Sequence, residues 1–600
     1  MINERLTKLR GKMSKEGIRW CMIPTCDYHG SEYLADYYKV RDFFSGFTGS
    51  AGTLVVSQND AYLFTDGRYF IQAADQLKGS SIQLMKMGEP GVPKVTELII
   101  NSINKGEKLG FDGRVVDSET GLNFEKELEA KECSVIYDFD PTEGIWEDRP
   151  GLVYNKPFIL DVKVAGESVK SKIERIRLKM DEKKTDVHIV TALDDIAWIL
   201  NMRGNDVENN PVFFAFLVIT DNKVVLYANI DDRDILSYLA QNDIEIEKYE
   251  EFFEKGMQSV NICTKKGILL DKTGANYKII KAIGSNIAVI DEMNPSTYMK
   301  AIKNECEIEN IKIANIKDGA AVVRFDRWLK EAIANNENLT ELSVSKKLAS
   351  FREENESYIE PSFDTIAAFG YHGAIVHYEP TAETDIQIGR NSFLLIDSGG
   401  QYAEGTTDVT RTYGIGEVAT KLKHDYTLVL KANLKLLNFK FMKGCRGNHL
   451  DIVARDFFWS EGRDYKHGTG HGIGALLNVH EGPNNIRWNI PEGKQPGVIY
   501  EPGMVTSDEP GVYIENEYGI RTETDMLCVE LETNEYGTFY GFEPLTYVPI
   551  DKKPIEIEYL SDEEIRWLNN YHMTVREKLA PMLRGKDLEY LMDVTEPLKR

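Results

Sequence analysis

The pattern of hydrophobic and polar positions divides the chain into three sections. The first, residues 1–152, opens with apolar residues at helical spacing around Leu6, Leu9 and Met13, which predicts an amphipathic helix. Short runs rich in β-forming residues follow at 52–57 and 61–65 and predict strands. The section ends near the turn-rich segment PTEGIWEDRPG.

The second section, residues 153–302, repeats this order of elements. A helix is predicted at 169–180, and strands are predicted at 186–192, 212–220 and 223–228. In both sections a helical segment precedes two strand-like runs joined by a turn. This shared order predicts two copies of one α/β module, although few residues are identical between them.

The third section, residues 303–600, has a different character. It opens with a long helix in which Ile308, Ile311 and Leu329 recur at helical spacing. From 391 to 547 short strands and many glycines dominate, with a helical stretch between them. A final helical segment follows.

Composition narrows the class of protein. The chain has 600 residues, of which 42% are hydrophobic and 28% charged, so it is globular and large enough for several domains. Its net charge of −25 disfavours binding to nucleic acid. The seven cysteines are scattered, no apolar run is long enough to cross a bilayer, and the first residues lack a signal core. We therefore expect a cytoplasmic protein without membrane contact.

The first segment that carries chemistry is SFLLIDSGGQYAEGTTDVTRTY, residues 392–413. An apolar run ends in Asp397, Gly399 and Gly400 are expected to turn the chain, and Asp408 lies in the next extended run. A hairpin of this kind would place the two aspartates face to face. Buried carboxylates are costly unless a cation pairs with them, which favours a metal. A hairpin with exposed aspartates explains this segment equally well.

The second segment is KHGTGHGIGALLNVHEGP, which contains three of the ten histidines, His467, His471 and His480. The glycines between them let the backbone approach a ligand closely. A phosphate-binding loop is a weak alternative, because the lysine and the serine or threonine of a P-loop are absent. Structural histidines are the other alternative.

The third segment is PGMVTSDEPGVYIENEYGIRTETDMLCVE, where Glu509 precedes Pro-Gly and Glu523 alternates with Arg521 and Asp525. Either glutamate alone is a weak signal. Together the three segments supply two aspartates, one histidine and two glutamates, each on or beside a predicted strand end. This hard, oxygen-rich set suits Mn²⁺, Co²⁺ or a catalytic Zn²⁺ pair, with the two metals about 3.5–4 Å apart.

These motifs resemble a known family. The order DSGGQYAEGTTD, HGTGHGIG, EPG and RTE is similar to that of the pita-bread metallopeptidases. With TDGRYF, WILNMRGNDVENNPVFF, NVHEGP and WLNNYH, the whole chain resembles the long, three-domain aminopeptidase P family. The resemblance implies an α/β (α+β) protein, with two creatinase-like N-terminal modules before a pita-bread catalytic domain and a C-terminal helical extension.

The resemblance also implies a role for each metal ligand. Asp408 and Glu523 are expected to bridge two divalent metal ions, with Mn²⁺ favoured over Co²⁺ or Zn²⁺. Asp397 would complete one metal site, and His471 and Glu509 would complete the other. The water held between the metals would be the nucleophile, and Glu509 the general base that accepts its proton.

Other residues match positions around the substrate in this family. His377 would lie near the substrate amine and the proline pocket, His480 would steady the scissile carbonyl, and His467 would line the proline site. Tyr513 and Arg521 would orient the ligand carboxylates. Arg68, in TDGRYF, would contact the distal part of the peptide. His372 matches no catalytic position and is expected to be a loop residue.

The implied activity is removal of the first residue from peptides whose second residue is proline, by an enzyme that forms a homodimer. One alternative is a prolidase limited to Xaa-Pro dipeptides, which the long three-section layout disfavours. The other is a peptide-binding module without catalysis. That reading is disfavoured because all five ligand positions carry the expected residue types.

Overall fold

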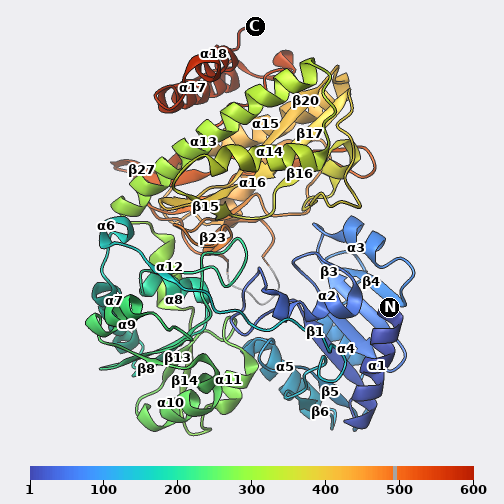
Figure 1. Cartoon of the computed structure of the whole chain (residues 1–600), viewed down its shortest axis with the longest axis vertical. Helices are drawn as coiled ribbons and strands as arrows, with labels where there is room; N and C mark the ends of the chain where they lie inside the picture. The colour runs from blue at the N-terminus through green and yellow to red at the C-terminus, as the bar shows by residue number, and fades with distance from the viewer. Residues whose placement is uncertain (491–495) are drawn as a thin grey trace. The chain divides into compact units, whose positions relative to one another are not determined.

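The computed structural model describes residues 1–490 and 496–600, and the chain divides into two compact units. The first unit contains residues 1–162 and 167–297, and the second contains 163–166 and 298–600 (Figure 1). Among the described residues, no helix combines the length and the apolar character needed to cross a membrane.

Two six-stranded sheets of identical topology form the core of the first unit, beside the short strand pair β7 (Phe158–Ile159) and β9 (Met202–Arg203). One runs in the order β4 (Ile82–Lys86), β3 (Ala61–Thr65), β2 (Thr53–Ser57), β1 (Trp20–Pro24), β5 (Lys108–Gly110), β6 (Ser134–Ile136). The other runs β12 (Ile244–Glu247), β11 (Val224–Tyr227), β10 (Phe216–Thr220), β8 (Val187–Val190), β13 (Ile268–Leu270), β14 (Val289–Asp291). In each sheet the first four strands in this order pair parallel, antiparallel and antiparallel, and the last two join in parallel. This identity of order and direction supports the predicted duplication.

The amphipathic helices of this unit form where their apolar stripes predict them. Helix α1 (Ile2–Lys15) buries Leu6, Leu9 and Met13. Helix α7 (Val169–Glu182) buries apolar residues along one face in the same way, and Ser168 caps its first turn. The shorter helices α2 (Val40–Ser45) and α8 (Leu193–Ile199) precede the second strand of their sheets in the chain.

Four sheets form the second unit. They are β16 (Ile366–Phe369), β17 (Ser392–Ser398) and β20 (Val409–Ile415); β15 (Tyr358–Pro361), β18 (Gly400–Tyr402) and β19 (Gly405–Thr406); β21 (Phe441–Met442), β28 (Gly537–Pro544), β27 (Met526–Asn534), β24 (Val505–Thr506), β22 (Gly470–Gly472) and β23 (Glu481–Ile486); and β25 (Gly511–Ile514) with β26 (Tyr518–Arg521). All five predicted metal ligands belong to this unit.

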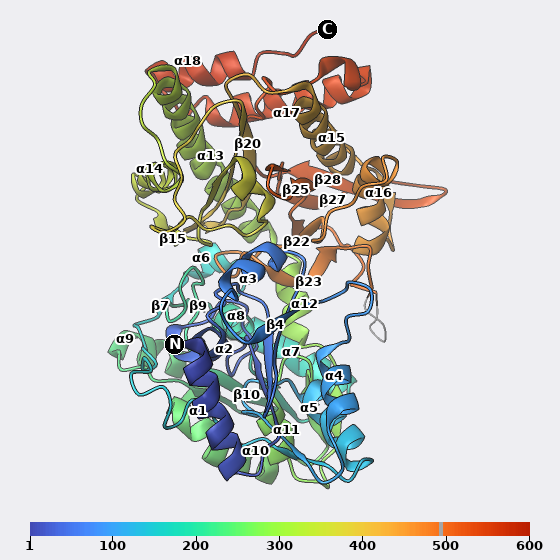
Figure 2. The same ribbon diagram turned by 90° about the vertical axis from the view of Figure 1, so that its right-hand side faces the viewer.

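Helices cover these sheets (Figures 1 and 2). They are α13 (Glu305–Ala334), α14 (Glu341–Glu353), α15 (Thr420–Leu437), α16 (Gly447–Trp459), α17 (Asp562–Leu579) and α18 (Gly585–Val594). Asn304 and Glu307 form a reciprocal capping box that fixes the start of α13. Phe325 and Leu329 of α13 share one core with Leu348 of α14 and with the apolar faces of β16, β17 and β20. The predicted long helix is thus confirmed, and it supports the strands that carry the aspartates.

Candidate metal centre

Asp397 and Asp408 lie at neighbouring ends of two paired strands. β17 pairs antiparallel with β20, and this register sets Asp397 opposite Thr410. Asp408 directly precedes β20 and is therefore at the same end of the pair. Both side chains are buried, with 8% and 4% of their surface exposed. The aspartates come together as predicted, and neither is an exposed turn residue.

The predicted turn at Gly399 and Gly400 is wrong. The chain continues into a different sheet as β18, turns at residues 403–404 and returns as β19. A Cβ on Gly399 would lie 2.0 Å from the carbonyl oxygen of Thr407 and 2.2 Å from the hydroxyl of Ser362. Glycine is therefore needed for the close approach of the two arms, not for a turn.

Two backbone hydrogen bonds between residues 469–471 and 507–509 position His471 and Glu509. The amide of Ser507 donates to the carbonyl of His471 at 2.9 Å, and the amide of Glu509 donates to the carbonyl of Thr469 at 2.8 Å. A Cβ on Gly470 would lie 1.8 Å from the carbonyl oxygen of Ser507, so this approach also requires glycine. The Ser507 hydroxyl then donates to Glu509 Oε1 at 3.2 Å.

Glu523 follows β26 and reaches the same place from a third segment. Its amide donates to the carbonyl of Thr410 at 3.2 Å, and the Thr410 hydroxyl donates to its Oε2 at 2.7 Å. Thr410 is the residue that pairs with Asp397 across the sheet. One strand position therefore sets the relative placement of two predicted ligands.

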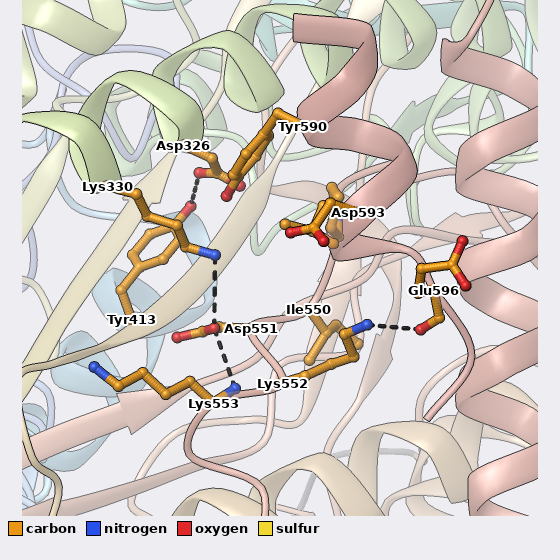
Figure 3. A pocket seen from close by; sticks show the side chains of 12 residues that line it. Asp326, Lys330, Tyr413, Ile550, Asp551, Lys552, Lys553, Tyr590, Asp593 and Glu596 are labelled. Carbon is orange, nitrogen blue, oxygen red and sulfur yellow. Dashed lines mark hydrogen bonds and ion pairs between the residues drawn. The ribbon is translucent and has the colours of Figure 1, made fainter. Parts of the chain in front are cut away.

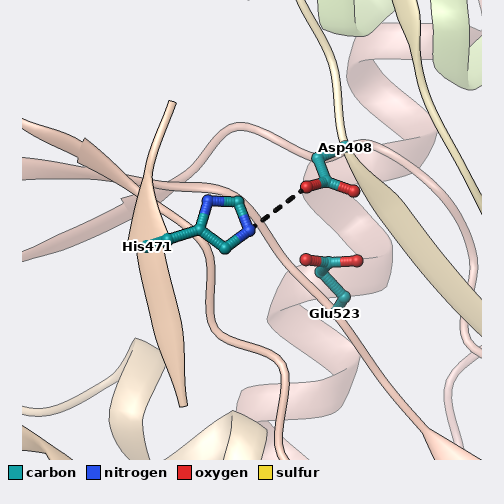
Figure 4. Close-up of side chains that lie close together, drawn as sticks. All are labelled: Asp408, His471 and Glu523. Atoms are coloured by element: carbon teal, nitrogen blue, oxygen red, sulfur yellow. Dashed lines mark ion pairs between the residues drawn. The ribbon is translucent and has the colours of Figure 1, made fainter. Parts of the chain in front are cut away.

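The predicted ligands converge, and Figure 4 shows three of them, Asp408, His471 and Glu523. One ligand atom from each of Asp408, His471 and Glu523 lies within 4.8 Å of the others. His471 Nε2 is 3.5 Å from Asp408 Oδ2 and 3.4 Å from Glu509 Oε1. Asp397 interacts electrostatically with Asp408, Glu509 and Glu523. All five predicted ligands thus belong to one cluster.

The electrostatics of this cluster favour a cation. Burial raises the pKa of Asp408 and Glu523 well above the usual range, and each neighbouring carboxylate raises it further. Burial also raises the pKa of Glu509 to about 7, although Arg521 and His480 oppose this. Ionised carboxylates packed together in low dielectric are unfavourable unless positive charge enters among them.

The donor set fits two divalent metal ions. His471 Nδ1 lies 3.0 Å from the carbonyl oxygen of Gly472, an acceptor, so Nδ1 carries the hydrogen and Nε2 directs its lone pair toward the carboxylates. Asp397 Oδ1 is buried with no hydrogen-bond partner in the described part of the chain. Four carboxylates and one imidazole match hard divalent ions and not a structural thiolate site.

Arg521 connects the ligands to a hydrogen-bonded support. It donates to Asp397 Oδ2 at 2.6 Å, to the Thr410 hydroxyl at 3.1 Å and to the Tyr513 hydroxyl at 2.8 Å. Tyr513 in turn lies 2.8 Å from His467 Nε2. Arg521, Tyr513 and His467 are therefore one network, which meets the predicted ligands at Asp397 through Arg521 and at Glu509, whose Oε2 lies 3.9 Å from His467 Nδ1.

The two remaining predicted histidines are held by different parts of the unit. The ring of His480 is 4.3 Å from that of His471, edge to face. His377 is half-buried in the turn after the 3₁₀ helix η4 (Gly370–Ala374), and the carbonyl of its neighbour Val376 accepts from Arg521 at 3.3 Å. His372 is buried within η4 and bonded to Glu341, so the expectation of a loop residue is wrong.

Arg68 belongs to the first unit, where its guanidinium is already engaged. It donates to both carboxylate oxygens of Asp66 at 2.9 and 2.8 Å and lies 3.8 Å from Glu32. Its predicted contact with peptide stays a prediction.

Sequence reasoning passed over two buried acids beside the cluster. Asp525 accepts the amide hydrogen of Asp408 at 3.2 Å, and burial raises its pKa well above the usual range. Asp508 is fully buried next to Glu509, and burial raises its pKa as well. The alternation of Asp525 with Glu523 was the only available signal, and it did not distinguish a supporting residue from an exposed one.

A separate pocket of about 370 Å³ lies in the same unit (Figure 3). Asp326 and Lys330 of α13, Tyr413 of β20, residues 549–553 and α18 line it. None of the predicted site residues is among its lining residues. Its mixture of lysines and acids does not select a ligand class.

Comparison with known proteins bears on the whole chain. Residues 309–530 match metallopeptidase family M24, residues 538–598 match the C-terminal region of that peptidase, and residues 5–142 and 148–307 each match a creatinase/prolidase N-terminal domain. A probable Xaa-Pro aminopeptidase P of Laccaria bicolor is 37% identical over 99% of this chain and 93% of its own length. Aminopeptidase P2 of Arabidopsis thaliana is 35% identical, covering 100% and 89%.

The chain belongs to the Xaa-Pro aminopeptidase family. A crystal structure of an X-prolyl aminopeptidase from Caenorhabditis elegans, described as a cytosolic enzyme with a di-nuclear active site, superimposes with a TM-score of 0.94. That protein is 33% identical, and the match covers 100% of both chains. The predicted family, fold class and assignment as a metallopeptidase are confirmed. The section boundaries at 152 and 302 remain predictions.

Proposed function

We propose that this Xaa-Pro aminopeptidase family member removes the first residue of peptides that carry proline at the second position. The observation that carries the proposal is the buried convergence of Asp397, Asp408, His471, Glu509 and Glu523 in a chain that matches such aminopeptidases along its whole length. Two divalent ions bound there would supply Lewis-acid activation of water and of the scissile carbonyl. We propose Mn²⁺ as the native ion.

The chain's own residues divide the remaining work. Glu509 is the proposed general base, because its carboxylate lies in the cluster, 3.4 Å from His471 Nε2, where it can accept the proton of a metal-bound water. His480, beside His471, would hold the carbonyl oxygen, and His377 would face the substrate amine. His467 would line the proline ring, held by Tyr513.

Recognition of proline follows from its chemistry. Proline has no backbone N–H and a fixed φ, so its ring must be selected by shape. The leaving nitrogen of a tertiary amide must gain a proton, and Glu509 can return the one it accepted. Arg521 would keep Asp397 oriented throughout, because its guanidinium remains charged at any working pH and donates to Asp397 Oδ2.

The test is hydrolysis of Arg-Pro-Pro and Arg-Ala-Ala by metal-stripped protein, with and without Mn²⁺, beside a Glu509→Gln variant. We expect arginine release only from Arg-Pro-Pro, only with metal and not by the variant. No release from either peptide with metal bound would refute the aminopeptidase and favour a binding module. Cleavage of Arg-Pro but not of Arg-Pro-Pro would indicate a prolidase. Metal analysis of the protein as isolated tests the choice of Mn²⁺.

We also propose a cytoplasmic homodimer, as the family resemblance implies. Trp459 and Trp488 are 40% and 45% exposed with ring centroids 5.8 Å apart, and interfaces commonly bury such side chains. Light scattering of the wild-type protein and of Trp459→Glu tests this. A monomeric wild-type protein would contradict it.

A further inference from the structure

One buried carboxylate gathers the segment that carries His377. Glu341 accepts the amide hydrogen of Phe369 at 2.7 Å and the hydroxyl hydrogen of Tyr378 at 2.7 Å. Nδ1 of His372 lies 2.9 Å from both of its oxygens. The three donors come from positions on both sides of His377, and Tyr378 is its immediate neighbour.

Glu341 itself is held by a rigid element. It is the first residue of α14, and its side chain is fully buried. Thr340 caps the helix through the amide of Ser343 at 3.2 Å. Val344, one turn further on, is buried in the core that α14 shares with β16 and β17. The carboxylate therefore ties a short 3₁₀ helix and the turn after it to a packed helix.

The same segment is fixed from the metal side. The carbonyl of Val376 accepts from Arg521, whose guanidinium also binds Asp397. Gly373 packs backbone to backbone against Gly519, because a Cβ on Gly519 would lie 1.7 Å from the carbonyl oxygen of Gly373. His377 thus lies between two anchors, one at Glu341 and one at the strand that leads to the ligands.

We propose that Glu341 is a positioning residue that sets His377 relative to the metal ligands. The proposal rests on the substrate-binding role proposed above for His377. The chemistry of the contact requires a carboxylate, because three donors share its two oxygens. A glutamine has one acceptor oxygen, and its NH₂ group would face either His372 Nδ1 or the Tyr378 hydroxyl, which also lies 3.2 Å from the carbonyl oxygen of Thr384. One of these contacts must therefore reverse or break, so replacement by glutamine weakens the anchoring of the His377 segment while preserving volume.

The experiment is a double-mutant cycle of Glu341→Gln and His377→Ala in the full-length protein with saturating Mn²⁺, read as kcat/KM for Arg-Pro-Pro. We expect Glu341→Gln to lower kcat/KM by about 10- to 100-fold, the usual effect of a displaced supporting contact. Metal content should remain that of the wild-type protein. In the His377→Ala background the same substitution should change kcat/KM less than about 3-fold, because its effect acts through the imidazole.

A milder pair of variants protects the test against misfolding. Tyr378→Phe removes the hydroxyl that donates to Glu341, and Tyr413→Phe removes an equally buried hydroxyl that donates to Asp326, in the separate pocket. Tyr378→Phe should lower kcat/KM by about 3- to 10-fold, and Tyr413→Phe should leave it unchanged.

Three results would overturn the inference. Full activity of Glu341→Gln would show that His377 needs no such anchor, and an undiminished effect in the His377→Ala background would show a path that bypasses the imidazole. Equal losses in Tyr378→Phe and Tyr413→Phe would show general destabilisation. An active wild type with unaffected His377→Ala would refute the role of His377 and this inference together while leaving the peptidase intact, whereas an inactive wild type would refute the proposed function.

Discussion

The two ends of strand β20 bury carboxyl groups in opposite circumstances. At one end Asp408 joins Asp397, Glu509 and Glu523, and burial with mutual repulsion raises the pKa of Asp408 well above its usual range. At the other end Tyr413 donates a hydrogen bond to the buried carboxyl of Asp326, whose pKa is raised to about 7 by burial and by the neighbouring Asp551, while Tyr413, Lys330 and Arg411 oppose the rise.

This difference distinguishes a buried carboxyl group with a structural role from buried carboxyl groups that bind metal. Asp326 can be neutralised by one proton near neutral pH, because its carboxylate neighbour Asp551 is paired with Lys330 at 3.9 Å. Four neighbouring carboxylates with one arginine among them retain excess negative charge, and a metal pair resolves this better than several protons. Burial alone therefore does not identify a metal site, whereas uncompensated clustering does.

The largest expected effect separates the two ends by activity. Glu523→Gln should lower kcat/KM for Arg-Pro-Pro by about 10³-fold, because a ligand carboxylate is lost while volume is retained. Asp326→Asn should remain within about 3-fold of wild type. Both are measured at saturating Mn²⁺ with metal content determined in parallel. Comparable losses in the two variants would remove the distinction.

Removing the metal should lower the free energy of unfolding by nearly as much as Glu523→Gln raises the activation free energy. Ions that bind only the folded state at 1,000 times their Kd add about 4 kcal/mol to the free energy of unfolding. Chelation should therefore shift the urea midpoint of wild type and of Asp326→Asn alike, and that of Glu523→Gln less. Superimposable curves with and without chelator would contradict a metal centre in the folded protein.

Asp326, at the Tyr413 end of β20, should make the stability of the protein depend on pH. The folded pKa of Asp326 is about 7 and the ordinary value about 3.9, so between these values the folded state holds a proton that the unfolded state has lost. Its contribution to the free energy of unfolding is therefore greatest below pH 4 and declines as pH rises through 7, by roughly 4 kcal/mol over the whole range. Urea titrations at pH 5 and 8 should show this decline in wild type and a smaller one in Asp326→Asn. An equal change in the free energy of unfolding between pH 5 and 8 in the two proteins would show that a group other than Asp326 takes up the proton.

The smallest effect concerns the single cation within the cluster. Arg521→Lys keeps the charge but cannot donate to Asp397, Thr410 and Tyr513 at once. Metal affinity should fall by about 10- to 100-fold, or 1.4–2.7 kcal/mol, as measured by calorimetric titration. Unchanged affinity would mean that charge alone supports the ligands.

The sequence predicted the parts of the site that depend on local order. Asp397, Asp408 and Glu523 lie at or beside strand ends, where an apolar run and a following polar residue reveal them. The course between the aspartates was wrong, because glycine reports conformational freedom without saying whether a turn or a close approach uses it. Gly399 serves the second purpose.

Residues that act through distant partners could not be found in this way. Glu341 and His372 meet only because α14 packs beside β16, and nothing in their spacing indicates that contact. Asp326 is one acid on a long helix, which sequence alone would place in solvent. Arg68 differs again, since its proposed role depends on a peptide and its present partners lie within its own unit.

The contact between Gly373 and Gly519 restricts how this sequence can vary. Each position excludes a side chain because of the other's backbone, so no single substitution is available at either one, and enlarging both would only compound the clash. Tyr371, two residues away, is 48% exposed and carries no such restriction. In a library that carries every amino acid at each position, variants at Gly373 and at Gly519 should therefore be lost, whereas variants at Tyr371 should be tolerated. The two intolerant positions are far apart in sequence, and together they mark the place where the His377 segment packs against the strand that leads to the metal ligands.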